Sequence, residues 1–132
     1  MENSFQKVKN YVLELGYQIN LENEEEGIVI ISNPTEGIQN MVLGVADPLL
    51  IMEQYLIDLP SLNAGSLQKL LQKNRDIVHG AFVLDESGSR VLFRDTLQSE
   101  NLDLNELEGS LNSLSLLLSE YSGTLLSLSK NV

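Results

Sequence analysis

The sequence predicts an α+β fold: a mainly antiparallel sheet of five strands with helices packed on it, in a single domain over residues 1–132. Stretches with apolar residues at spacings of three and four alternate with shorter stretches that are β-branched or alternately apolar and polar, which indicates helices and strands. The connections between the strand-like stretches are short, and short connections favour antiparallel neighbours. With 132 residues, of which 42% are apolar, the chain is long enough to bury its own core.

A helix is expected over residues 3–15. Asn3 is a suitable N-cap with Gln6 three residues later, and Gly16 suits the turn that ends a helix. The apolar stripe of this helix consists of Phe5, Val8, Val12 and Leu15.

Three strands of a meander are expected next. Residues 17–22 alternate between apolar and polar side chains, 28–31 form a β-branched run, and 38–45 follow a turn at 33–37. The first hairpin turn carries an acidic run, Glu22, Glu24, Glu25 and Glu26. A solvated loop is the simplest interpretation of this run. An acidic docking patch or cation site is the alternative, although the spacing of a calcium loop is missing.

Two consecutive helices are expected after the meander. Asp47 and Pro48 are typical N-cap and first-turn residues of a helix that Pro60 ends. Its main apolar face, widened by Ile51 and Tyr55, comprises Leu49, Met52, Leu56 and Leu59. A helix that is apolar over so much of its circumference needs contacts on two sides. The second, shorter helix is capped by Asn63 and carries Leu67, Leu70 and Leu71.

The chain is expected to close with a hairpin and a long helix. Residues 77–85 and 90–97 form the hairpin strands around Gly88, which suits the turn. Leu and Tyr then follow the spacing of a heptad seam at Leu104, Leu107, Leu111, Leu114, Leu118, Tyr121, Leu125 and Leu128. Gly109 and Gly123 within this helix predict the close approach of another element, since each costs about 1 kcal/mol relative to Ala.

The charge of the chain excludes several classes of partner. Eight Lys and Arg against 19 Asp and Glu give a net charge of −11. Such a chain lacks the positive surface that binds DNA, RNA or anionic lipid, so we expect no nucleic acid and no membrane as partner. Most of the excess acid lies in residues 1–66, which hold two Lys and ten Asp or Glu. The amino terminus lacks the regions of a secretory signal and no apolar run spans a bilayer, so a cytoplasmic location is expected.

No set of side chains predicts catalysis. The sequence contains no Cys, which excludes disulfides, thiolate metal sites and cysteine nucleophiles, and the single His argues against a Ser-His-Asp triad. We expect His79 to be a structural or surface residue in a strand, and Arg90 and Arg94 to be solvent-facing charges near Asp85 or Asp95. The protein is therefore expected to be non-enzymatic and to hold no metal and no cofactor.

Three stretches carry a resemblance to a known family: LLQKN at 70–74, HGAFVLD at 79–85 and VLFRDTL at 91–97, before a leucine-rich helix through Tyr121. Together with the order helix, three strands, two helices, two strands and long helix, they resemble the type III secretion chaperone-like fold. That is the fold of the CesT/Tir chaperone superfamily and of its YbjN-like branch. The resemblance implies a homodimer that acts as a chaperone or adaptor and holds a segment of a client protein without ATP.

The resemblance also implies where two binding surfaces lie. The client would bind apolar residues of the first helix and strands: Phe5, Val8, Val12, Ile19, Leu21 and Ile28. The dimer seam would fall on the helix after Pro48, at Leu49, Met52, Tyr55 and Leu56, alone or together with the last hairpin. The alternative function, from a different class, is a small regulatory or ligand-sensing module that binds a metabolite between sheet and helix. A structural subunit of a larger assembly is a third hypothesis.

Overall fold

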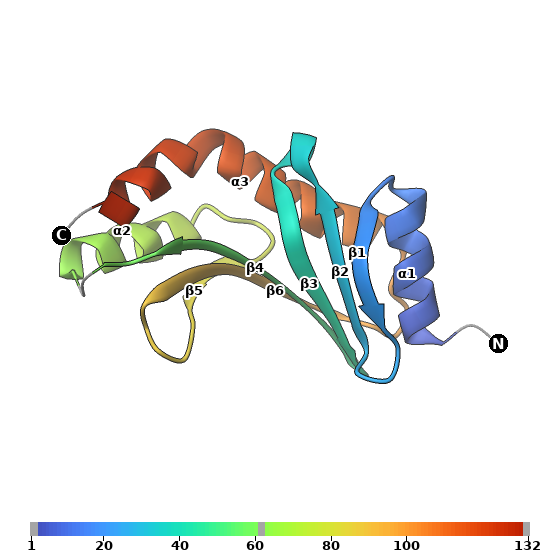
Figure 1. The fold of residues 1–132 in the computed structure, drawn as a ribbon. Helices are drawn as coiled ribbons and strands as arrows, with labels where there is room; N and C mark the ends of the chain where they lie inside the picture. Colours follow the sequence, from blue (N-terminus) through green and yellow to red (C-terminus); the bar gives the residue numbers. More distant parts are fainter. Residues whose placement is uncertain (1–2, 61–62, 131–132) are drawn as a thin grey trace.

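The computed structural model describes residues 3–60 and 63–130. Its elements appear in Figure 1 in the order α1 (Ser4–Glu14), β1 (Gln18–Asn23), β2 (Ile28–Asn33), the 3-10 turn η1 (Pro34–Glu36), β3 (Ile38–Ala46), β4 (Leu49–Asp58), α2 (Ala64–Asn74), β5 (Ala81–Leu84), β6 (Arg90–Gln98) and α3 (Leu104–Lys130). The expected α+β class is confirmed, with six strands in place of the five predicted.

The six strands form one antiparallel sheet with the spatial order β1-β2-β3-β4-β6-β5. The expected first helix, meander and last helix are confirmed, and the side chain of Asn3 caps α1 by accepting from the Gln6 N–H at 2.8 Å. The last hairpin is also confirmed, but β5 begins only at Ala81 because Gly80 has a φ of +87°, which interrupts the strand.

The helix predicted after Pro48 is wrong, and this stretch is the long strand β4. The stretch is apolar at nearly every position, so it fits a period of two as well as the period of a helix. Tertiary pairing decides between the two, because β4 is hydrogen-bonded to β3 on one side and to β6 along its length on the other. Asp47 and Pro48, joined by a cis peptide bond, form the turn between β3 and β4 instead of a helix start.

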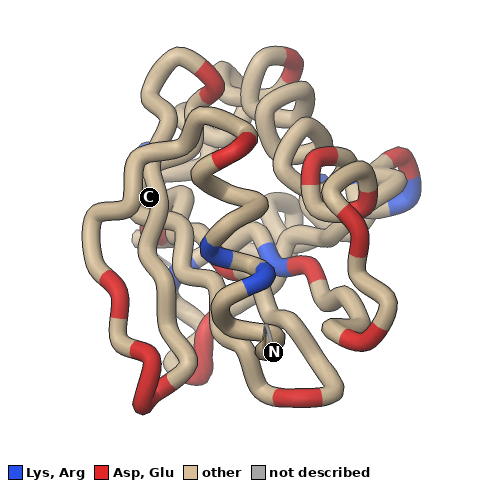
Figure 2. Tube along the Cα trace, turned by 90° about the vertical axis from the view of Figure 1, so that its right-hand side faces the viewer, with Lys and Arg blue, Asp and Glu red and all other residues tan. Residues whose placement is uncertain are grey.

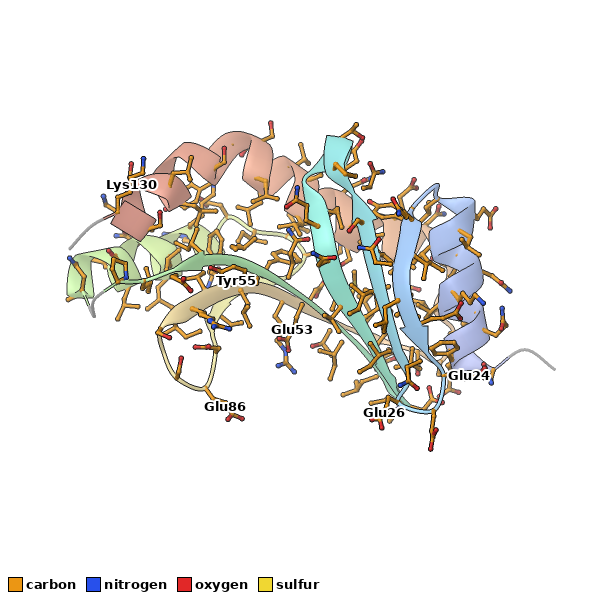
Figure 3. All side chains as sticks on the ribbon, viewed as in Figure 1. Glu24, Glu26, Glu53, Tyr55, Glu86 and Lys130 are labelled. Carbon is orange, nitrogen blue, oxygen red and sulfur yellow. The ribbon has the colours of Figure 1, made fainter. Side chains whose placement is uncertain are left out.

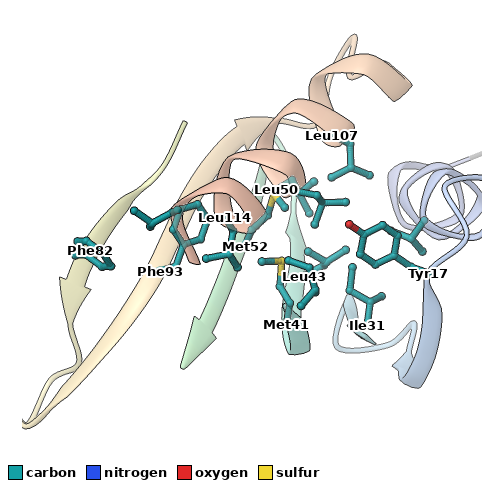
Figure 4. Packing of buried hydrophobic residues seen from close by; sticks show 14 of the residues in the cluster. Tyr17, Ile31, Met41, Leu43, Leu50, Met52, Phe82, Phe93, Leu107 and Leu114 are labelled. Atoms are coloured by element: carbon teal, nitrogen blue, oxygen red, sulfur yellow. The ribbon is translucent and has the colours of Figure 1, made fainter. Parts of the chain in front are cut away.

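The core lies between one side of the sheet and the helices (Figure 4). Leu50, Met52 and Phe93 project from the sheet towards Leu107 and Leu114 of α3, and all five are fully buried. The helices of the described part of the chain all lie on this side of the sheet, and the buried stripe of α1 covers its β1–β2 end (Figure 1). The opposite side carries none of them.

The two glycines of α3 differ in their surroundings. A Cβ on Gly109 would lie 3.7 Å from the His79 ring, so another segment does approach there. A Cβ on Gly123 would meet nothing within 4 Å, so the close approach predicted at that position is wrong.

Candidate functional site: the outer face of the sheet

The candidate site is the side of the sheet that points away from the helices, which we call the outer face. The strand registers align its side chains in rows that cross several strands. The row that crosses all six strands contains Leu21, Ile30, Val42, Glu53, Arg94 and Ala81. Ile28, Gly44, Ile51 and Thr96 form a second row, and Tyr55, Leu92 and Val83 form a third. These rows are mainly apolar although no described helix covers them, with Asn23 opposite Ile28 as a polar member at the β1 end.

The exposure of these apolar side chains distinguishes the outer face from an ordinary solvated sheet. Leu21 is 51% exposed and Tyr55 is 52% exposed, and Val42 and Leu49 are also accessible. In an antiparallel sheet with one solvated side, that side normally carries polar residues. Continuous apolar surface on a folded chain marks a site of contact with another molecule.

An ion pair divides the outer face into two halves. Arg94 donates to the Glu53 carboxylate at 3.0 Å, between neighbouring strands near the middle of the longest row. Glu53 projects from the side of the sheet opposite α3 (Figure 3). We call Leu21, Ile28, Ile30 and Val42 the N-terminal half of the outer face, and Tyr55, Leu92 and Val83 the C-terminal half. Leu49 also lies on the outer face, but Glu53 separates it from Tyr55 along β4.

Tyr55 lies in the most polar surroundings of the C-terminal half. The guanidinium of Arg90 lies 5.9 Å from the centre of the Tyr55 ring and 3.7 Å from the Asp58 carboxylate. Partial desolvation of the phenol, followed by its contact with Asp58, raises the pKa of Tyr55 above its ordinary value. The ring therefore stays neutral at physiological pH and offers an apolar face with a polar rim. Arg90 and Arg94 face solvent as predicted, and their guanidinium groups pair with Asp58 and Glu53. The expected proximity of Arg90 to Asp85 is confirmed, since the Arg90 backbone N–H donates to the Asp85 carboxylate at 3.2 Å.

The six residues predicted to bind a client fall on both sides of the sheet. Phe5, Val8 and Val12 are buried in the core, and Ile19 packs against it. Leu21 lies on the outer face and Ile28 is half-buried in the neighbouring row. The part of the predicted surface that another molecule can reach is thus the N-terminal half of the outer face.

The four residues predicted to form a dimer seam are also separated. Leu49 and Tyr55 project from the outer face, whereas Met52 is fully buried on the opposite side. Leu56 is half-buried beside a β-bulge of β4 and lines a hollow of about 290 Å³ with Leu118. A helix would have placed the four on one stripe, but a strand directs alternate residues to opposite sides.

Sequence reasoning missed four residues of the outer face: Ile30, Val42, Leu92 and Val83. Each was assigned to a strand. When both sides of a strand are apolar, however, its sequence does not show which side faces the core. The available signal was that both alternate sets of residues in these strands are apolar. A strand with one solvated side shows a polar residue at every second position.

A second candidate site surrounds His79. This side chain is exposed in the loop before β5, and not in a strand as predicted. A hollow of about 290 Å³ lies between this loop and α3, with Lys73, His79 and Glu120 in its wall. Within residues 3–60 and 63–130, no three His, Asp or Glu side chains are placed to hold a metal ion. No described helix is long and apolar enough to cross a bilayer.

The comparison with protein families decides what this architecture is. The family model CesT_Tir_1 matches residues 1–131. The chain belongs to the CesT_Tir_1 family. The expected resemblance to CesT/Tir chaperones and YbjN-like proteins is confirmed, and no curated protein matches the sequence.

Solved structures show the CesT_Tir_1 fold in proteins of low sequence identity. YbjN from E. coli has a TM-score of 0.69 at 12% identity, covering 92% of each chain. The ExsC-ExsE complex has a TM-score of 0.66 at 19% identity, covering 99% of this chain and 100% of that one. The Yersinia pestis type III secretion chaperone SycH, in complex with a fragment of YscM2, has a TM-score of 0.62 at 18% identity, covering 96% and 100%. At these identities the likeness shows the shared fold.

Proposed function

We propose that this protein is a non-enzymatic, cytoplasmic chaperone or adaptor that acts as a homodimer and holds a segment of a client protein. The observation that carries the proposal is the exposed apolar outer face on a chain of the CesT_Tir_1 family. An open apolar sheet face suits an extended or helical segment of another protein. Two of the similar structures are complexes with a second protein, ExsE and a fragment of YscM2, and this supports a protein ligand here.

We assign the client to the N-terminal half of the outer face. Leu21 and Val42 supply exposed apolar contacts there, and the acidic hairpin of Glu24 and Glu26 lies at the end of the same strands (Figure 3). Acidic residues also outnumber Lys and Arg on the side of the molecule that carries α1 (Figure 2). The client segment should therefore combine apolar anchors with Lys or Arg at its rim.

Capture of the client from the native host tests this proposal. The wild-type chain should retain one protein in stoichiometric amount, and Leu21→Glu should lose it because a carboxylate then replaces an apolar contact. Thr96→Glu, at an exposed position of β6 with three strands between it and β1, is the matched control and should retain the client. Association of the purified client should also slow as salt is added. Equal capture by all three proteins would contradict the assignment.

A small-molecule sensor is the second candidate function, and the hollow beside His79 is the observation that favours it. Its volume of about 290 Å³ is close to the lower size of ligand pockets, and its wall combines apolar and charged side chains. Native mass spectrometry of the protein purified from its host separates the two functions. A bound compound without any bound protein would favour the sensor.

A further inference from the structure

A hollow of about 140 Å³ lies between α3 and the segments that follow α1 and β2. Tyr17 comes directly after α1, Glu36 belongs to η1, and Glu108 belongs to α3. All three line the hollow, and Leu15 and Leu111 supply an apolar part of its wall. A single water needs far less space. The hollow can therefore hold a group of several atoms.

The side chain of Tyr17 brings an unpaired hydroxyl to this hollow. The Tyr17 N–H donates to the Val12 carbonyl at 3.0 Å, so the end of α1 fixes the residue. Its ring lies among the core side chains (Figure 4), and the residue is only 8% exposed. A buried Tyr hydroxyl normally has a hydrogen-bond partner. Within residues 3–60 and 63–130 the Tyr17 hydroxyl has none.

Two carboxylates flank the hydroxyl. Burial, and then the charges of Glu36 and Glu108, raises the pKa of Tyr17 above its ordinary value, so both carboxylates act on its hydroxyl. Both Glu residues are exposed, and Ser115 Oγ donates to Oε2 of Glu36 at 2.8 Å, which holds this carboxylate towards α3. No Lys or Arg in the described part of the chain pairs with either of them. The mouth of the hollow thus carries two negative charges without a cation.

The groups around the hollow suit an organic cation better than a metal ion. Among the described residues, no three His, Asp or Glu side chains are placed to hold a metal, and part of the wall is apolar. A guanidinium group has five N–H donors in one plane, so it can bond several acceptors on different sides at once. It is also more weakly hydrated than an ammonium group, so it loses less on entering a partly apolar site.

We infer that the hollow between η1 and α3 binds a guanidinium group, held by the carboxylates of Glu36 and Glu108 and by the Tyr17 hydroxyl. The hydroxyl accepts an N–H of the group, and the carboxylates neutralise its charge. The group can belong to a free compound such as arginine or to an Arg side chain of a protein segment. The inference does not depend on the proposed client, because the hollow adjoins α3 and the outer face points away from the helices.

Nuclear magnetic resonance of the full chain tests the inference. Titration with Nα-acetyl-argininamide should shift the amide resonances of Asn33 and Asn112, which also line the hollow. Nα-acetyl-citrullinamide has the same shape without the charge and should bind at least about tenfold more weakly, since charge-assisted hydrogen bonds are the stronger ones. Free arginine is the third probe. Tighter binding of free arginine than of the acetylated amide identifies a free compound, and the reverse order identifies an Arg side chain of a protein.

Glu108→Gln tests the assigned residues. The affinity for Nα-acetyl-argininamide should fall about tenfold, because a hydrogen bond between two charged groups is lost. Glu106→Gln makes the same change at an exposed position two residues earlier on α3 that does not line the hollow. It is the matched control and should keep the wild-type affinity. Equal losses in the two variants would show only a general attraction to an acidic protein and would overturn the inference.

Tyr17→Phe separates binding from a structural role. The hydroxyl has no partner within the described residues, so the urea midpoint of this variant should equal that of wild type. Its affinity for Nα-acetyl-argininamide should fall about fivefold, because one acceptor is lost. A lower urea midpoint would show that the hydroxyl is bonded within the chain, and this result also overturns the inference.

Three results with the wild-type chain would contradict the site itself. Unchanged resonances of Asn33 and Asn112 in the titration would leave a hollow filled by water only. Equal affinities for the arginine and citrulline amides would show that the charge is not recognised. Displacement of Nα-acetyl-argininamide by Mg²⁺, but not by Na⁺ at the same ionic strength, would identify a metal site instead.

Discussion

Gln54 is a buried polar side chain that completes the sheet where two strands diverge. The pairs between β3 and β4 run from Ala46 opposite Leu49 to Val42 opposite Glu53, one residue before Gln54. Beyond them, Nε2 of Gln54 donates to the Gly37 carbonyl at 3.1 Å and Oε1 accepts from the Gln39 N–H at 3.1 Å. The side chain is 5% exposed, so these bonds replace water for two backbone groups.

Gln54→Leu should therefore destabilise the protein by more than its change in size suggests. Leucine fills a similar volume but leaves the part-buried Gly37 carbonyl and Gln39 N–H without their partner, which costs about 1–3 kcal/mol for the two groups together. Urea unfolding measures the free energy of unfolding. Gln39→Ala is the control, since the Gln39 side chain is exposed and only its backbone takes part, and it should change stability by less than about 0.5 kcal/mol. Equal effects of the two substitutions would show that the Gln54 bonds contribute nothing.

At the scale of the element, β4 shows which parts of this fold the sequence determines locally. The helix α1 was predicted because its apolar residues repeat at one period only and Asn3 caps it. The strand β4 has apolar residues at the spacing of a helix and at the spacing of a strand. That it is a strand depends on pairing with β6, which is distant in the sequence, and with β3, whose register the sequence does not specify. The wrong helix also gave a wrong dimer seam, because Met52 and Tyr55 would lie on one face of a helix but lie on opposite sides of a strand.

The loop that leads into β5 contains a glycine at which any side chain would meet both backbone strain and a steric clash. Gly80 has a φ of +87°, and a Cβ there would overlap Cζ of Phe93. Gly88 has a similar φ of +74° in the next turn, but a Cβ there would meet nothing within 4 Å. The two positions therefore separate backbone strain from steric overlap.

Gly80→Ala should lower the melting temperature and the free energy of unfolding much more than Gly88→Ala. Both substitutions pay about 1–2 kcal/mol for the left-handed backbone. Only the first also forces the buried ring of Phe93 to move, which adds about 1–3 kcal/mol. Thermal and urea unfolding of the two variants measure the difference. Equal losses would show that Phe93 moves aside without cost.

For the whole molecule, the sequence predicted the family and the excess of acid but not the shape of the binding surface. The outer face contains residues from all six strands, and its rows follow from five registers that single-strand patterns do not specify. Leu21 and Tyr55 were predicted for different surfaces, and both project from the same side of one sheet. The Glu53–Arg94 pair between them gives a physical boundary for two separate contacts.

The last prediction uses that boundary to test the proposed homodimer. Tyr55 is 52% exposed and Leu21 is 51% exposed, so a Glu at either position should leave the fold of the single chain intact. If the C-terminal half of the outer face forms the seam, Tyr55→Glu places a carboxylate in it beside Asp58 and should halve the mass measured by light scattering. Leu21→Glu, the matched control in the N-terminal half, should keep the dimer mass. A wild-type mass of 14.7 kDa would contradict the homodimer, and loss of the dimer in Leu21→Glu alone would place the seam in the other half.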